Sequence, residues 1–116
     1  MYNYKTFDTS QLEFIAVATV TELGNGERLL FDIGGESIAL FNIAGEYFAI
    51  ADICSHDDGP VAEGDLYDHE IECPRHGARF DLRTGSALSL PAVVDIPAYP
   101  VRIEGNDILI GLPKEG

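Results

Sequence analysis

The chain has 116 residues, a length that fits one domain with a modest hydrophobic core and leaves no room for a second catalytic domain. Twenty acidic residues against seven basic residues give a formal net charge of −13. This charge disfavours nucleic acids and anionic membrane surfaces, and we expect neither as a partner. The acidic surface serves either solubility or docking onto a basic partner protein.

The first twenty residues contain one lysine and one short apolar run, over residues 14–20. A basic leading segment, a small-residue cleavage site and an apolar stretch long enough to cross a bilayer are all missing. We therefore expect no signal peptide and no membrane anchor, and we predict a cytoplasmic protein.

The remaining chain predicts an all-β fold. Short runs rich in Ile, Val, Leu and Phe are separated by turn signals such as Gly34-Gly35, Ala44-Gly45 and Gly105-Asn106. No sustained helical period, internal repeat or linker interrupts this pattern, so we expect one domain over residues 1–116. The expected strands are residues 27–33, 37–43, 47–50, 70–73, 79–82, 96–104 and 107–112.

The chain has two cysteines, and each lies close to a histidine. Cys54 and His56 form a C-x-H pair, and after a gap of sixteen residues Cys73 and His76 form a C-x-x-H pair. Two thiols and two imidazoles in paired clusters indicate a metal centre. The third histidine, His69, lies in a polar stretch between apolar runs, and we expect a solvated turn residue there.

Two alternative roles for these four residues stay open. A structural zinc site accepts the same donors, although zinc fingers usually pair Cys with Cys and His with His, whereas the donor types interleave here. A disulfide between Cys54 and Cys73 would also use both thiols, but it would leave both histidine spacings unexplained.

The pattern C-x-H, followed at this distance by C-P-x-H-G, resembles the signature of Rieske iron–sulfur proteins. The resemblance covers residues 45–110: Asp58-Gly59-Pro60 looks like the first-loop turn, residues 78–85 like the hairpin after the second loop, and residues 99–102 like the return strand. It implies the Rieske fold, an antiparallel β-sandwich or incomplete barrel with a cluster-binding subdomain inserted at about residues 51–91.

The resemblance also implies a cofactor, one Rieske-type 2Fe-2S cluster per chain. In such a centre two thiolates hold one iron and two imidazoles hold the other, which raises the potential above that of an all-cysteine ferredoxin. By this resemblance Cys54 and Cys73 would hold the inner iron, while His56 and His76 would hold the outer iron and form the electron port.

The residues after the second ligand pair predict a low reduction potential. High-potential Rieske proteins carry a Ser directly after the H-G of this loop, a Tyr two residues later, and an extra cysteine in each loop. This chain has Ala78 and Phe80 at the two positions and no further cysteine. Hydrogen bonds to the cluster sulfurs raise the potential. Their absence predicts a value of about −150 mV, near the low end of the Rieske range.

The resemblance implies an electron carrier rather than an enzyme. We expect a monomeric ferredoxin that accepts single electrons from a flavin-dependent ferredoxin reductase and passes them to a terminal oxidoreductase, above all a Rieske non-haem iron dioxygenase of the aromatic-ring type. Arg75, Arg79 and Arg83 lie beside the second ligand pair, so the contact tip would be mixed in charge. The alternatives are a small Rieske-fold subunit of a nitrite reductase-type complex and a protein of iron–sulfur assembly or redox sensing.

Overall fold

The computed structural model describes residues 9–53, 60–74, 77–90 and 94–114. Within these ranges the chain forms ten β-strands and two short 3-10 helices, and every described strand pair is antiparallel, which confirms the all-β prediction. The elements are η2 (Thr9–Gln11), β1 (Leu12–Thr19), η3 (Val20–Glu22), β2 (Arg28–Ile33), β3 (Glu36–Ile43), β4 (Glu46–Ala51), β5 (Leu66–Tyr67), β6 (Glu70–Glu72), β7 (Arg79–Asp81), β8 (Ala98–Tyr99), β9 (Val101–Glu104) and β10 (Asp107–Pro113).

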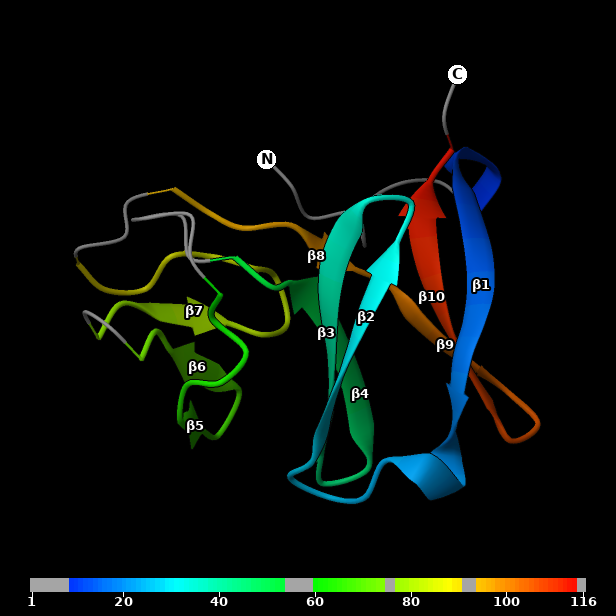
Figure 1. The fold of residues 1–116 in the computed structure, drawn as a ribbon, viewed down its shortest axis with the longest axis horizontal. Coiled ribbons are helices and arrows are strands. Elements are labelled where there is room, and N and C mark those ends of the chain that lie inside the picture. Colours follow the sequence, from blue (N-terminus) through cyan, green and yellow to red (C-terminus); the bar gives the residue numbers. More distant parts are fainter. Residues whose placement is uncertain (1–8, 54–59, 75–76, 91–93, 115–116) are drawn as a thin grey trace.

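The strands form three sheets. One sheet has the order β2-β3-β4-β8, the second has the order β1-β10-β9, and the third is the short sheet β5-β6-β7. Figure 1 shows the third sheet as a separate small lobe at one end of the molecule, with the first sheet between it and the second. The chain enters the small lobe after β4 and leaves it before β8, so the lobe is an insertion between neighbouring strands of the first sheet.

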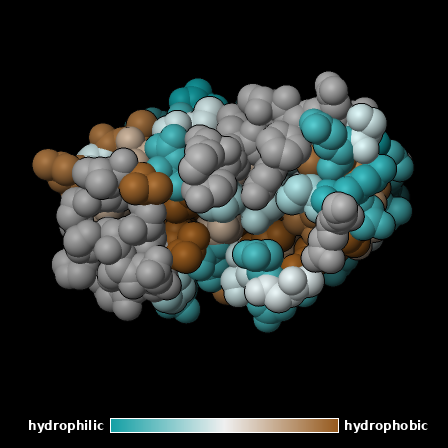
Figure 2. Space-filling view, turned by 90° about the horizontal axis from the view of Figure 1, so that it is seen from above, coloured by the Kyte–Doolittle hydropathy of each residue, from teal (hydrophilic) through white to brown (hydrophobic). Residues whose placement is uncertain are grey.

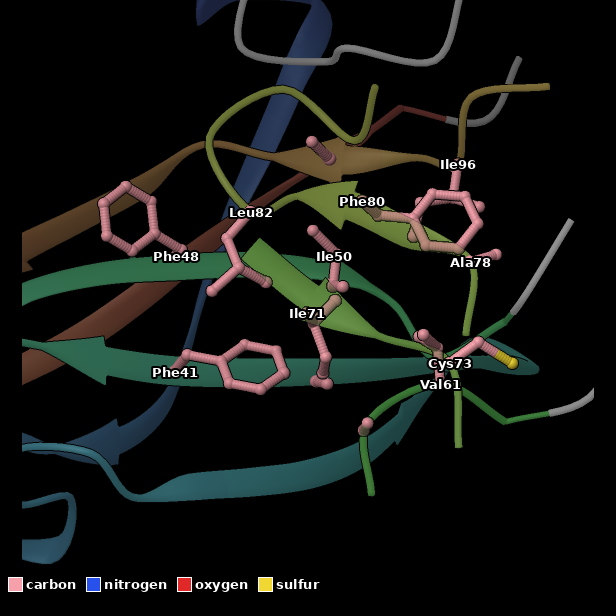
Figure 3. Close-up of a cluster of buried hydrophobic side chains, with 13 residues drawn as sticks. Phe41, Phe48, Ile50, Val61, Ile71, Cys73, Ala78, Phe80, Leu82 and Ile96 are labelled. Atoms are coloured by element: carbon pink, nitrogen blue, oxygen red, sulfur yellow. The ribbon is translucent and has the colours of Figure 1, made fainter. Parts of the chain in front are cut away.

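Strand β3 is buried on both faces, and its side chains alternate between two hydrophobic cores. Leu40 belongs to a core shared with the second sheet, which includes Ile110 and is called here the sandwich core. Phe41, the next residue, belongs to a core shared with the small lobe, which includes Phe80 and is called here the lobe core (Figure 3). The first sheet, called here the central sheet, therefore packs against the second sheet on one face and against the small lobe on the other.

Hairpin turns were predicted correctly from glycine. Gly34 and Gly35 both have positive φ, at 59° and 86°, which is the backbone of a type I′ turn, and they join β2 to β3. Ala44 and Gly45 adopt the same signs, at 53° and 88°, between β3 and β4. These turns set the register of the three-stranded core of the first sheet.

Two parts of the strand prediction were incomplete or wrong. The apolar run at 14–20 was considered only as a candidate targeting segment, yet its residues 14–19 belong to β1, which pairs with β10 from end to end. Residues 96–104 were expected to form one strand, but Pro100 separates β8, which pairs with β4, from β9, which pairs with β10. Proline has no N–H for a ladder, so the chain changes sheet at this residue.

Candidate metal centre

Cys73 is the one predicted ligand that lies in the described part of the chain. It follows β6 directly, its side chain is 1% exposed and its thiol is free of any disulfide. Its N–H donates to the carbonyl of Ala78 at 2.7 Å, and its own carbonyl accepts from the N–H of Gly77 at 3.0 Å. These two bonds place Gly77 and Ala78 beside Cys73, directly before β7.

In Figure 3 the sulfur of Cys73 lies at the opposite end of the lobe core from Phe41 and Phe48. The thiol is therefore embedded in apolar side chains on one side, as a ligand of a buried iron would be. Cys54, His56 and His76 fall outside the described residues. Among the residues that the structure does describe, no group of three metal-ligating side chains gathers.

The first ligand segment is described at its two flanks. On the N-terminal flank, Oδ1 of Asp52 accepts hydrogen bonds from the N–H groups of Val61 at 2.9 Å and Ala62 at 2.8 Å. The carboxylate thus joins the residues just before and just after the segment 53–60. The sequence analysis did not identify Asp52, because its hydrogen-bond partners are backbone N–H groups, which a motif of cysteines and histidines does not mark.

The residues expected to tune the cluster are apolar and buried. Ala78 and Phe80 are both 0% exposed and belong to the lobe core together with Cys73. Neither side chain can donate a hydrogen bond. The backbone of this region is well partnered: the N–H of Arg79 donates to Oγ of Ser89 at 2.9 Å.

Arg79 does not project freely toward a partner. Its guanidinium lies over the ring of Tyr67, with Cζ 4.0 Å from the ring centroid, and its Nε is 3.3 Å from the carboxylate of Glu72. A second carboxylate, that of Glu70, is 3.7 Å from its Nη1. Arg79 therefore offsets part of the negative charge of the two glutamates on β6.

Arg83 forms a two-pronged ion pair with Asp81. Its Nε and Nη2 donate to the two carboxylate oxygens at 3.0 and 3.1 Å, and its backbone N–H adds a third bond at 2.8 Å. Burial alone would raise the pKa of the Asp81 carboxyl, but these hydrogen bonds and the positive charge of Arg83 outweigh burial and lower that pKa. The same contact raises the pKa of the Arg83 guanidinium. Arg75 lies outside the described residues.

His69 lies in the turn between β5 and β6, as predicted, but its side chain is partly buried. Its ring meets Phe48 of β4 edge-on, with the centroids 5.4 Å apart, and its carbonyl accepts from the N–H of Leu82 at 2.8 Å. The residue therefore connects the small lobe to the central sheet instead of facing only solvent.

None of the helices in the described ranges has the length and hydrophobicity needed to cross a bilayer.

Comparisons with known proteins agree with this arrangement. Residues 13–100 match the model of the Rieske [2Fe-2S] domain. The chain is 45% identical over 91 residues to the ferredoxin component of biphenyl 2,3-dioxygenase from Rhodococcus jostii, covering 78% of this chain and 85% of that protein. Its structure resembles the ferredoxin of carbazole 1,9a-dioxygenase from Nocardioides aromaticivorans, with a TM-score of 0.81, 36% identity and coverage of 87% of this chain and 98% of that one.

A third match is a chain in the solved complex of reduced oxygenase and oxidized ferredoxin in carbazole 1,9a-dioxygenase. It is 24% identical, with a TM-score of 0.80 over 88% of this chain and 95% of that chain, and it supports the fold. The relatives are ferredoxin components, so the prediction of an electron-transfer component rather than a catalytic enzyme is confirmed. The chain belongs to the Rieske [2Fe-2S] domain family and carries a Rieske-type 2Fe-2S cluster.

Proposed function

We propose that this protein is a ferredoxin that carries single electrons from a flavin-dependent ferredoxin reductase to a terminal oxygenase of the aromatic-ring dioxygenase kind. The observation that carries the proposal is the 45% identity to a dioxygenase ferredoxin component, over 85% of that component's length. A match of this extent includes both the sheets and the small lobe, rather than a short motif alone.

We propose Cys54 and Cys73 as ligands of the inner iron and His56 and His76 as ligands of the outer iron. The free and buried thiol of Cys73, directly after β6, supports its place in this set. A Rieske cluster supplies one-electron redox chemistry. The chain itself holds the ligands, excludes water from one side of the centre through the lobe core, and presents the other side to a partner.

The low reduction potential expected from the sequence is part of the proposal. The buried Ala78 and Phe80 offer no hydroxyl to a cluster sulfur, so two contacts that would stabilise the reduced state are missing. We expect a potential of about −150 mV, the low end of the Rieske range.

The end of the molecule that carries the small lobe is the proposed contact surface for both redox partners. Leu88, Leu90 and Val94 follow β7 in the chain, are 47%, 77% and 53% exposed, and are called here the apolar edge. Figure 2 shows hydrophobic surface gathered at this end. A small exposed apolar edge on a strongly acidic protein suits a short-lived encounter, in which charge orients the partners and apolar contact completes the fit.

We also propose that residues 1–116 form one Rieske domain, with a cluster-binding subdomain at about residues 51–91, and that the protein acts as a monomer. The position of β5, β6 and β7 within that range supports the subdomain. Light scattering of the cluster-loaded protein would measure the oligomeric state. Localisation in the cytoplasm stays a prediction of the sequence, which cell fractionation would check.

The deciding experiment is an EPR-monitored redox titration of protein purified without air. A reduced-state spectrum with the low average g value of mixed His and Cys ligation, titrating near the low end of the range, is the expected result. A Rieske signal at high potential would contradict the argument from Ala78 and Phe80. Bound metal without such a signal would favour a zinc site or a structural subunit, and ready transfer of the cluster to an acceptor protein would favour iron–sulfur assembly.

A further inference from the structure

Arg28 connects the central sheet to the small lobe. It lies on β2, half-buried, with its guanidinium 5.5 Å from the centroid of the Phe41 ring. Its Nη1 donates to two backbone carbonyls of the lobe, that of Ala62 at 2.5 Å and that of Gly64 at 2.7 Å. These partners lie 34 and 36 residues further along the chain, so the contact is a product of the fold and not of local sequence.

Ala62 is held from both sides of its backbone. Its N–H donates to Oδ1 of Asp52, and its carbonyl accepts from Arg28. Asp52 lies at the end of the central sheet, after β4, and Arg28 lies on β2. One side chain on a strand of that sheet and one just past the end of another strand therefore bind the backbone of the same residue. This segment is the part of the chain that follows the first pair of proposed ligands.

The same segment presses against the strand that leads to Cys73. The N–H of Glu72 donates to the carbonyl of Asp65 at 2.9 Å. A Cβ built on Gly64 would lie only 1.7 Å from the carbonyl oxygen of Glu72, so the two backbones are in direct contact. Glu72 is the residue before Cys73, and its position therefore depends on where Gly64 is held.

We propose that Arg28 is a positioning residue for the iron–sulfur cluster. By fixing the carbonyls of Ala62 and Gly64, it sets the separation between the end of the first ligand segment and the strand that delivers Cys73. Two ligand segments that bind one cluster must keep a constant distance, and groups outside the ligand set commonly provide that constraint. This inference rests on the proposed ligand set Cys54, His56, Cys73 and His76.

Arginine suits this role better than lysine. One guanidinium nitrogen carries two hydrogens in a fixed plane, and here it directs them to two carbonyls at once. A lysine ammonium retains the positive charge but lacks the rigid geometry. Comparison of the two residues at position 28 therefore separates the effect of geometry from the effect of charge.

The test compares the cluster-loaded parent protein with Arg28→Gln and Arg28→Lys. Arg102→Gln is the matched control, because Arg102 also stacks on a phenylalanine, with Cζ 3.9 Å from the centroid of Phe14, but it lies on β9 in the second sheet. The readouts are the g values and line widths of the reduced EPR spectrum, the rate of cluster loss to an iron chelator, and the melting temperature.

We expect Arg28→Gln to broaden and shift the EPR signal and to lose its cluster about tenfold faster than the parent. Arg28→Lys should lose it at an intermediate rate, and Arg102→Gln should match the parent in spectrum and rate. An unchanged spectrum and unchanged rate in both Arg28 variants would overturn the inference. Where Arg28→Gln does not fold, Arg28→Lys decides: a changed spectrum supports positioning, and a parental spectrum refutes it.

The EPR signal of the parent protein distinguishes a failure of this inference from a failure of the proposed function. A parent without a Rieske EPR signal would refute the proposed ligand set, whatever the variants do. A parent with a normal Rieske signal, together with Arg28 variants that keep both that signal and the parental rate of cluster loss, would refute the role of Arg28 and leave the proposed ligand set intact.

Discussion

The two faces of β3 are covered in different ways. On the sandwich side, Leu40 packs against a sheet whose strands β1 and β10 pair over seven positions, so long backbone ladders maintain the structure. On the lobe side, Phe41 packs against a sheet of two- and three-residue strands. Here contacts between side chains and backbone, such as those of Asp52 and Arg28, replace the missing ladder bonds. The comparison shows that the lobe, which we propose binds the cluster, depends most on individual residues.

The largest effect is expected at Cys73. The Cys73→Ala variant removes a proposed iron ligand from the lobe and should abolish the Rieske EPR signal and the visible absorbance. The Cys73 side chain belongs only to the lobe core, so the strand ladders of the first two sheets keep all their contacts. Iron content and EPR of protein purified without air would measure the result, and a retained Rieske signal would remove Cys73 from the ligand set.

A pair of neighbouring substitutions on β3 would separate the two cores. Leu40→Ala and Phe41→Ala each empty a fully buried site and should lower the free energy of unfolding by about 2 to 5 kcal/mol. Phe41→Ala should also speed cluster loss, because it opens the lobe core, whereas Leu40→Ala should leave the EPR spectrum unchanged. Equal effects of both variants on the cluster would contradict the division into two cores.

The same division explains what could be predicted from the sequence. The runs at 27–33, 37–43 and 47–50 became β2, β3 and β4, because strong apolar patterns and glycine turns act locally. The strand at Leu66–Tyr67 gave no such signal, since two residues are too few to show an alternating pattern. Paired Cys and His residues indicated the metal centre, but Asp52 and Arg28 bind backbone groups, which no sequence pattern reveals.

A smaller effect is expected at Ala78, beside the proposed ligands. Ala78→Ser places a hydroxyl where high-potential relatives carry one, and a hydrogen bond to a cluster sulfur should raise the potential. A net hydrogen bond of about 0.5 to 1.5 kcal/mol corresponds to a rise on the order of 20 to 65 mV for one electron. Ala98→Ser is the control, because Ala98 is equally buried in the lobe core but lies on β8. An unchanged potential in Ala78→Ser would contradict the argument for a low-potential protein.

The smallest effect is expected at the ion pair on the outer edge of the small lobe. The pKa of Asp81 is lower in the folded protein than its ordinary value of 3.8, so this carboxylate stabilises the fold above that pH. The stabilisation is lost as the pH falls through the folded-state pKa. Arg83→Gln removes the hydrogen bonds and charge that lower this pKa, so the pKa should rise and the acid-sensitive limb of the stability curve should flatten. NMR titration of the Asp81 carboxyl would measure the shift.

Arg102→Gln is the appropriate comparison for that titration. Arg102 also pairs with a carboxylate, that of Glu104 at 3.6 Å, but it lies on β9 in the second sheet. Its loss should leave the titration of Asp81 unchanged. If Arg83→Gln also left that titration unchanged, the ion pair would not govern the acid response of the lobe. The hydrogen bond from the Leu82 N–H to the carbonyl of His69 would then be the next interaction to test between this part of the lobe and the central sheet.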